Sequence, residues 1–528
     1  ARAMVKEEDR KTTTAATTTG SRASSVSLLV CSAVLGIGAG VGLYFWNRTK
    51  RNRTPWRRGK GNANKGVMTK TQVDLLEGYE GKCVLTKKQM EGIIEDFLAR
   101  MEEGLEREEQ QLKMLPSFVE KMPCGKEEGE FLAIDLGGTN SRVVRLALKG
   151  GQVREMVAHE DPIPKELMVG TTKELFDFIA RQVKTFLGKH NTLAQSGQGK
   201  GGKIPIGFCF SYPMKQTGLA NGEIVNWNKG FDIKDTFGKD LVELLEGSLS
   251  EYKIQGKVFA MVNDTVGTLA AHKFIDQDTQ LGVILGTGSN AAYIEGKRRI
   301  TKLQGGETKR EEDKMIVNIE WGNFKSSRLP YLEEDREVDE RTPNKGKQHF
   351  EKMISGMYLG EMVRLACLRA SAEGNLFGGS QKDKLQQAWT FPTSLVSRID
   401  GLGPEKLDQV KKELSAALDI PRAEITHGCA RFVSRLCQLV GDRSAALAAT
   451  GVTAIYRYLM QSKQVSPNQR FVVAVDGGLF EHYPRYPERM QQTFISLLGK
   501  EQAKRVELVH SPDGSGIGTA VIAAATAR

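Results

Sequence analysis

The sequence predicts a large α/β protein with two similar halves. Its 528 residues and 58.2 kDa suffice for two ordinary domains or one large two-lobed domain. The body of the protein begins near residue 71, and an amphipathic helix is predicted around residues 86–112. Thereafter helical stretches alternate with short apolar runs that end in glycine, which is an α/β pattern. Two of these strand-and-turn segments, about 150 residues apart, resemble each other. A hydrophobic content of 40% and a charged content of 26% are typical of a globular protein.

The positive charge is concentrated near the amino terminus. The formal net charge is +11 and the isoelectric point is about 9.1. Residues 48–70 hold nine Lys or Arg and no acid, and residues 1–25 hold five basic and three acidic residues. Removing these 14 basic and 3 acidic residues from the totals of 75 and 64 leaves 61 of each sign over residues 71–528. A neutral body argues against a nucleic-acid partner.

Two familiar kinds of site are disfavoured. The seven Cys include no CxxC pair, which indicates a reducing compartment and argues against zinc. Residues 197–204 (GQGKGGKI) match the phosphate-binding GxxxxGK pattern only up to Ile204, and the run precedes a strand instead of following one. We therefore interpret residues 194–203, like residues 304–313, as an exposed loop.

A membrane anchor is predicted over residues 26–46. These 21 residues carry no charge, and as a helix they would span about 30 Å, the thickness of a bilayer's hydrocarbon core. Tyr44 and Trp46 suit the interface, and the basic residues that follow place the remainder on the cytosolic side by the positive-inside rule. An uncleaved signal-like anchor and a plastid-targeting element are the alternatives.

The two similar segments are FLAIDLGGTNSRVVRLAL (131–148) and LGVILGTGSNAAYIE (281–295). Each reads as strand, glycine turn and strand, which excludes the strand-turn-helix of a dinucleotide fingerprint or a Walker loop. Such a turn can present backbone N–H groups and a threonine hydroxyl to an anion. Because hairpin turns use the same residues, one turn alone would equally fit a structural role.

Two more glycine clusters strengthen the phosphate interpretation: VVAVDGGLF (472–480) follows a strand, and SPDGSGIGTA (511–520) precedes the last helix. Together with Asp135 and Asp476 at strand ends, the four clusters resemble the nucleotide-binding core of actin, the 70-kDa heat-shock chaperones and sugar kinases. This resemblance implies an actin-like ATPase (ribonuclease H-like) fold of two lobes around a cleft.

Five further segments choose among these proteins: FSYPMKQ (210–216), NWNKGFD (226–232), VNDTVGTLAA (262–271), NIEWGNF (318–324) and FEKMISGMYLGE (350–361). With DGGLFEHYP (476–484), they resemble the eukaryotic hexokinases of plant and algal type over residues 75–525. The resemblance implies ATP-dependent phosphorylation of glucose, mannose and fructose at the 6-hydroxyl, with Mg²⁺ and cleft closure, as the first step of glycolysis. It disfavours a chaperone-like ATPase and leaves a membrane-tethered hexose sensor as the alternative.

The expected organisation is a polar tail (1–25), the anchor (26–46), a basic linker (47–70), a large lobe (71–125 and 264–511) and a small lobe (126–263 and 512–528). Plant hexokinases also carry an N-terminal hydrophobic anchor. We expect a monomer that binds hexose and Mg-ATP and lies on the mitochondrial outer membrane, or alternatively in the plastid.

The resemblance implies that Asp264 is the general base that accepts the proton of the sugar 6-hydroxyl. Its hexose-binding set comprises Ser211, Asn228, Lys229, Asn263, Asp264, Asn290, Glu320 and Glu351. Two of these acids have simpler alternatives, since Asp264 could cap a helix and Glu351 could be a solvated helix residue. Asn228 stands where the family usually has Thr, so sugar preference is open.

For the nucleotide, the resemblance implies two phosphate turns and an adenosine side. The first turn comprises Gly137, Gly138, Thr139 and Asn140, with Arg142 as charge partner, and the second comprises Gly286, Thr287 and Gly288. Thr268 would reach the transferred phosphate, and Asp135 would orient Mg²⁺ through water, so no direct protein ligand to the metal is expected. The adenosine would contact Gly451, Gly477, Gly478, Gly514, Ser515 and Gly516.

Overall fold

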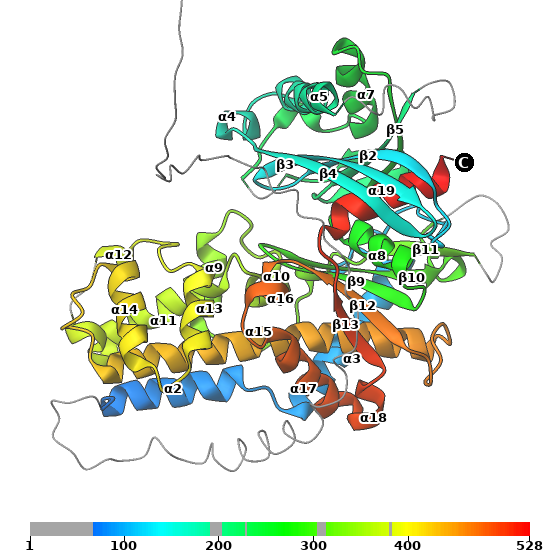
Figure 1. Ribbon diagram of the computed structural model, residues 1–528. Helices are drawn as coiled ribbons and strands as arrows, with labels where there is room; N and C mark the ends of the chain where they lie inside the picture. Colours follow the sequence, from blue (N-terminus) through cyan, green and yellow to red (C-terminus); the bar gives the residue numbers. More distant parts are fainter. Residues whose placement is uncertain (1–66, 191–202, 228–229, 304–312, 380–382, 528) are drawn as a thin grey trace, which may run out of the picture. The chain divides into compact units, whose positions relative to one another are not determined.

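Two mixed β-sheets organise the chain (Figure 1). The computed structural model describes residues 67–190, 203–227, 230–303, 313–379 and 383–527. The larger sheet has the strand order β1-β11-β10-β9-β12-β13. Strands β9, β10 and β11 pair antiparallel, whereas β12 runs parallel to both β9 and β13. The bounds are β1 (Leu115–Pro116), β9 (Thr279–Leu285), β10 (Ser289–Gly296), β11 (Lys314–Asn318), β12 (Phe471–Asp476) and β13 (Val506–His510).

The five-stranded sheet repeats this plan. Its order is β4-β3-β2-β5-β8, in which β2, β3 and β4 are antiparallel and β5 runs parallel to β2 and β8. In each sheet a hairpin, β2–β3 or β9–β10, therefore lies beside a parallel strand. The bounds are β2 (Gly129–Leu136), β3 (Asn140–Lys149), β4 (Gln152–Pro162), β5 (Ile204–Phe210) and β8 (Gly256–Val262); β6 (Met214–Gly218) and β7 (Asn221–Ile224) form a separate pair.

Two helices lie between the sheets (Figure 1). Helix α8 (Asp264–Ile275) packs on β9 and β10, α19 (Gly514–Thr526) packs on β2, β5 and β8, and the two helices pack on each other. They approach so closely because glycines meet at the crossing. A Cβ atom on Gly518 would lie 1.8 Å from the carbonyl oxygen of Gly267. The helix starts at Asp264 and Gly514 are thereby fixed relative to each other.

Alternating side chains bury both faces of each sheet. Val283 and Tyr293 join the core cluster that contains the long helix α15, whereas Ala292 and Ile294 join the cluster that contains α8. This period of two is the expected strand pattern, and it appears on both faces because helices cover both. Helices α5 (Thr172–Lys189) and α7 (Leu241–Glu251) cover the outer face of the five-stranded sheet.

A helical layer around α15 (His427–Gln461) covers the larger sheet. Its main helices are α2 (Lys70–Cys83), α3 (Lys87–Glu106), α11 (Leu359–Gly374), α13 (Thr393–Leu402), α14 (Leu407–Leu418) and α17 (Tyr486–Leu498). The short helices are α4 (Lys165–Met168), α9 (Glu333–Arg341), α10 (His349–Ile354), α12 (Asp383–Gln386), α16 (Gly478–His482), α18 (Lys500–Ala503), η1 (Lys234–Thr236), η2 (Lys297–Arg299), η3 (Trp321–Asn323) and η4 (Leu376–Gly379).

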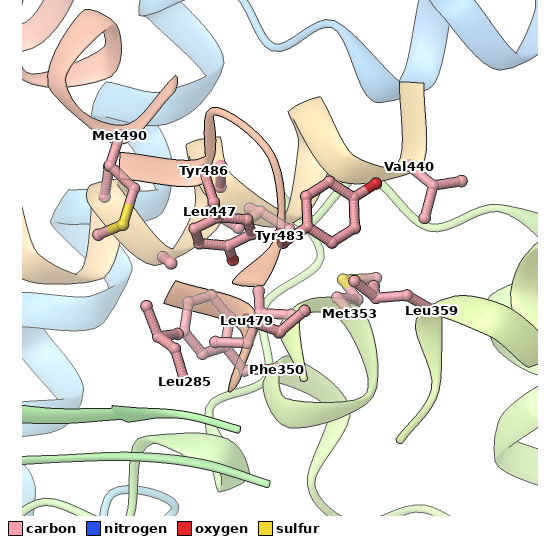
Figure 2. Close-up of a cluster of buried hydrophobic side chains, with 14 of the residues drawn as sticks. Leu285, Phe350, Met353, Leu359, Val440, Leu447, Leu479, Tyr483, Tyr486 and Met490 are labelled. Atoms are coloured by element: carbon pink, nitrogen blue, oxygen red, sulfur yellow. The ribbon is translucent and has the colours of Figure 1, made fainter. Parts of the chain in front are cut away.

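One part of this core ties the site-bearing elements together (Figure 2). Leu285 ends β9, Phe350 and Met353 lie on α10, Leu447 lies on α15, and Leu479 lies on α16. All are buried. The strand end before Gly286, the helix that carries Glu351 and the turn at Gly477 therefore share one hydrophobic cluster, which holds them in fixed relation.

Some sequence expectations need correction or fall outside the described residues. The helix expected over 86–112 is α3, which begins at Lys87 and ends at Glu106; Glu109 and Met114 already have positive φ, so the helix cannot continue there. The segment predicted as an anchor, 26–46, lies outside the described residues. Within the part that is described, no helix is long and apolar enough to span a membrane.

Candidate active site

The predicted site residues follow the carboxyl ends of parallel strands. Ser211 comes directly after β5 and Asn263 directly after β8, while the turn at Gly137 follows β2. In the larger sheet, Gly286 follows β9 and Gly477 follows its parallel neighbour β12. Parallel strands end at the same edge of a sheet, so each sheet gathers polar groups at one edge, as is usual for ligand sites in α/β proteins.

Asp264 is the first residue of α8. The helix cap is its neighbour Asn263, whose Oδ1 accepts a hydrogen bond from Thr265 N at 3.0 Å, so the alternative that Asp264 is the cap is wrong. Asp264 Oδ1 accepts from Thr265 N (2.7 Å) and Thr265 Oγ1 (3.1 Å). The side chain of Asp264 therefore stands in the first turn of α8.

A chain of amides and a carboxylate extends from Asn263. Asn290 Nδ2 lies 3.4 Å from Asn263 Oδ1, 2.8 Å from Asn318 Oδ1 and 3.2 Å from Glu320 Oε1. Asn318 Nδ2 donates to Glu320 Oε1 at 2.9 Å. Glu320 adopts φ +57°, and its backbone N–H donates to Asn318 Oδ1 at 3.3 Å. The structure therefore brings three predicted hexose residues together.

Asn318 is the member of this network that sequence reasoning missed. It ends β11, is 5% exposed and links Asn290 to Glu320. Its position could have identified it from the sequence, because Asn318 is the first residue of the segment NIEWGNF and ends an apolar strand with an amide. Buried amides are hydrogen-bonded, so such a residue organises its neighbours.

Glu351 is tied to the second glycine turn. Its Oε2 accepts a hydrogen bond from Ser289 N at 2.8 Å, and a Cβ on Gly288 would lie 2.8 Å from the same oxygen. Gly288 is therefore needed for the carboxylate to approach the turn. Glu351 is half-buried on α10, so the alternative of a fully solvated helix residue is wrong.

Of the remaining hexose candidates, the structure describes Ser211, which directly follows β5. Ser211 is 8% exposed, and its N–H donates to Leu136 O at 3.2 Å. Asn228 and Lys229 lie outside the described residues. On either side of them, the rings of Trp227 and Phe231 stack with centroids 5.2 Å apart.

Hydrogen bonds and an ion pair with neighbouring residues hold the first phosphate turn in place. Gly137 N donates to Asn140 O at 3.0 Å, and Tyr212 Oη donates to Gly137 O at 2.8 Å. The Asn140 side chain is hydrogen-bonded to Glu160, and Arg142 forms an ion pair with Asp513. Thr139 O accepts from Ile163 N, and Gly138 lies between these contacts at the tip of the β2–β3 turn.

The second phosphate turn has the same kind of support. Gly286 N donates to Gly288 O at 3.0 Å, while the oxygens of Gly286 and Thr287 accept from Gly356 N and Met357 N. The turn is therefore held against the connection between α10 and α11. The backbone at Gly477, which has φ +118°, lies against the end of β9 just before this turn. The approach is so close that a Cβ on Gly477 would lie 2.5 Å from Leu285 C and O.

Three acids line the start of α19. Ser515 Oγ donates to Asp135 Oδ2 at 2.8 Å, and Gly514 N donates to Asp476 Oδ2 at 3.2 Å. Burial raises the pKa of Asp135, raises that of Asp476 to about 6 and raises that of Asp513 to about 7. Sequence reasoning did not single out Asp513, although it precedes the Gly514, Ser515 and Gly516 run.

The carboxylate of Asp135 is the candidate contact for hydrated Mg²⁺. Asp135 Oδ1 is buried and has no hydrogen-bond partner among the described residues, which fits a water-mediated contact with a cation. Within the same residues, no group of three or more His, Cys, Asp or Glu could hold a metal ion.

The last nucleotide candidates differ in their surroundings. Thr268 Oγ1 donates to Asp264 O within α8, and a Cβ on Gly514 would lie 2.9 Å from it, so Thr268 adjoins the start of α19. Gly478 begins α16, next to Gly477. Gly451 lies inside α15, where a Cβ would be 3.0 Å from the Trp321 ring. The structure gives Gly451 a packing role, and its adenosine contact stays a prediction.

Comparisons with known proteins point to one family. Family models described as hexokinase match residues 75–274 and 280–525. Hexokinase-2 of Solanum tuberosum and hexokinase-1 of Spinacia oleracea are each 40% identical to this chain over 454 residues, 85% of this chain and 90% of the relative. A solved hexokinase from Schistosoma mansoni complexed with glucose has a TM-score of 0.75 at 33% identity, covering 86% of this chain and 99% of that one. The likeness confirms the predicted two-lobed fold.

Proposed function

Since the chain belongs to the hexokinase family and is a plant-type hexokinase, we propose that it transfers the γ-phosphoryl group of ATP to the 6-hydroxyl of glucose, and also of mannose and fructose, as the first step of glycolysis. The observation that carries the proposal is the network of Asn263, Asn290, Asn318 and Glu320 beside Asp264. A sugar offers hydroxyls that both donate and accept, and clustered amides and carboxylates match them.

Asp264 is the proposed general base. Both hydrogen bonds from Thr265 reach Oδ1, so Oδ2 is the oxygen that we expect to take the proton of the sugar 6-hydroxyl. As that proton leaves, the sugar oxygen forms its bond to the γ-phosphorus, the bond to the β-phosphate oxygen breaks, and ADP departs. General-base help of this kind typically contributes about 10²- to 10⁴-fold.

The glycine turns are proposed to hold the nucleotide. The N–H groups of Gly137 and Gly286 close their own turns, so the backbone N–H groups at residues 138 and 139 and at residues 287 and 288 would contact phosphates. The start of α19 adds its favourable dipole for an anion. Bound Mg²⁺ neutralises phosphate charge. Asp135, whose Oδ1 is buried without a hydrogen-bond partner among the described residues, would hold the hydrated ion through water.

We also propose that hexose closes the two lobes. The candidate sugar residues come from both sheets, because Ser211 follows β5 whereas Glu351 contacts the turn after β9. A sugar held by both would draw the lobes together and exclude water, which otherwise competes for the phosphoryl group.

The subcellular location of the protein is a separate proposal, which rests on residues 26–46 and the basic residues that follow them in the sequence. We propose that a monomer is anchored through this segment, with the enzyme facing the cytosol, on the mitochondrial outer membrane or alternatively in the plastid. Liposome flotation tests the anchor: the full chain should float, and residues 67–528 should not. Flotation of both, or of neither, would contradict the anchor.

The proposed reaction is tested by incubating the purified protein with Mg-ATP and glucose, mannose or fructose in turn. Phosphorus NMR should identify the 6-phosphate with each sugar. Product with only one of the sugars would narrow the substrate range. Tight sugar binding without any phosphorylated product would instead favour the hexose-sensor alternative.

A further inference from the structure

An ion pair joins the first phosphate turn to the start of the last helix. Arg142 Nη1 lies 2.5 Å from Asp513 Oδ1, and the two side chains are 27% and 10% exposed. Arg142 is on β3, two residues after Asn140, and Asp513 directly precedes α19. The residue expected to bind a phosphate thus already holds an anion from its own chain.

Asp513 sits in a position that costs stability. It has φ +57° and makes no side-chain cap to α19, and its second oxygen is buried without a hydrogen-bond partner in the described part of the chain. Its other charged neighbours, Asp135, Asp476 and Glu160, are all acidic. Arg142 is therefore its one favourable charge among these neighbours, and a neutral residue would avoid the repulsion.

A carboxylate and a phosphate are alternative partners for the same guanidinium. Arginine binds both through charge-assisted hydrogen bonds from the same N–H groups. The start of α19, a helix of 13 residues, favours either anion. Asp513 therefore offers Arg142 the same kind of contact that a nucleotide phosphate would.

We propose that the Asp513 carboxylate competes with a nucleotide phosphate for the guanidinium of Arg142. The ion pair forms in the absence of nucleotide, a bound phosphate displaces the carboxylate, and the ion pair forms again when the nucleotide leaves. This inference rests on the proposed function, in which Arg142 contacts phosphate. Asp513 is then a positioning residue that acts through Arg142. It weakens the binding of ATP and ADP and assists the release of ADP.

The test uses two substitutions that keep the backbone conformation. Asp513→Asn retains the shape of the side chain and Asp513→Gly removes it, and both residues tolerate positive φ. Calorimetric titration of the full chain with Mg-ADP at pH 8, above the pKa of about 7 of Asp513, should show roughly tenfold tighter binding for both variants, because Arg142 no longer has a charged competitor. Unchanged or weaker binding in both would overturn the proposal.

A double-mutant cycle separates competition from a general charge effect. In an Arg142→Met background, Asp513→Asn should no longer tighten Mg-ADP binding. Asp161→Asn is the matched control, since this nearby acid lies opposite Ser141 on β3 and contacts His159 instead of Arg142; any effect should be the same in both backgrounds. A gain from Asp513→Asn that persists without Arg142 would overturn the proposal. If the wild type neither binds Mg-ADP nor phosphorylates hexose, the proposed function fails as well.

Discussion

At the level of single residues, Asn318 organises the network that we propose as the sugar site. It holds Asn290 and Glu320 in place with hydrogen bonds of 2.8 and 2.9 Å. Asn318→Ala should raise the KM for glucose roughly tenfold or more while changing kcat much less, because each lost hydrogen bond to a charged or buried partner costs about 1–3 kcal/mol. Steady-state kinetics measures both constants.

The control for that prediction is Asn468→Ala, which alters an exposed asparagine outside the network and should leave both constants unchanged. Equal KM values for Asn318→Ala and the wild type would show that the network does not position sugar-binding groups.

The raised pKa of Asp476 predicts how the stability of the folded protein depends on pH. Burial raises its pKa from 3.8 to about 6, so the folded protein holds a proton that the unfolded chain releases. The stabilisation that this bound proton gives to the folded state is fully present below pH 3.8 and is lost as the pH rises through 6. The loss corresponds to about 3 kcal/mol. The thermal midpoint of the ligand-free protein should therefore fall less between pH 5 and 7 in Asp476→Asn than in the wild type, and parallel curves would contradict this.

Sequence motifs predicted several residues that the structure brings together, but not the partners of those residues. Asn263, Asn290 and Glu320 were predicted from motifs and do meet. Asn318 and Asp513 were not singled out, because their importance depends on contacts across the chain: Asp513 faces Arg142, 371 positions away. Spacing along the sequence carries no information about such a pair.

At the scale of elements, the crossing of α8 and α19 sets the relation between the proposed base and the nucleotide side. Gly518→Ala would place a methyl group 1.8 Å from Gly267 O, so the helices must separate. We expect a thermal midpoint lower by several degrees, since overpacking costs about 1–3 kcal/mol, and a clear loss of kcat. Differential scanning calorimetry and the phosphorylation assay measure these effects.

Gly247→Ala on α7 is the matched control, because nothing lies within 4 Å of the new methyl group. It should be neutral or slightly stabilising, as alanine favours a helix. A Gly518→Ala protein as stable and active as this control would show that the crossing tolerates separation.

The glycines also show a limit of sequence reasoning at this scale. The run DGSGIG was interpreted as nucleotide contacts through Gly514 and Gly516, whereas Gly518, two positions further on, allows the helix crossing. Gly451 likewise packs against Trp321. A glycine needed for close packing and one that approaches a ligand look the same in a sequence.

At the scale of the whole molecule, the two-lobed α/β fold was predictable because the paired glycine turns mark two hairpins that lie beside parallel strands. The helical layer around α15 was not, since which helix covers which sheet depends on distant contacts. The helix expected to reach residue 112 stops at Glu106 because the chain turns there to enter the larger sheet as β1.

Closure of the two lobes is a prediction about the whole molecule. If candidate hexose residues on both sheets bind one sugar, glucose should reduce the radius of gyration measured by small-angle scattering, whereas a sugar that does not bind should leave it unchanged. Residues 67–528 suffice for this comparison, since residues 63–528 form one compact unit. Identical scattering with and without glucose would contradict closure.

Asp264 is the residue that we propose to perform proton transfer within the hexose site. The most direct measurement compares kcat for glucose phosphorylation with the glucose dissociation constant, for the wild type and for Asp264→Asn, which keeps the shape of the side chain at the start of α8. We predict that kcat falls by about 10²-fold or more while glucose binding changes only a few-fold. A variant that turns over glucose at the wild-type rate would contradict the account.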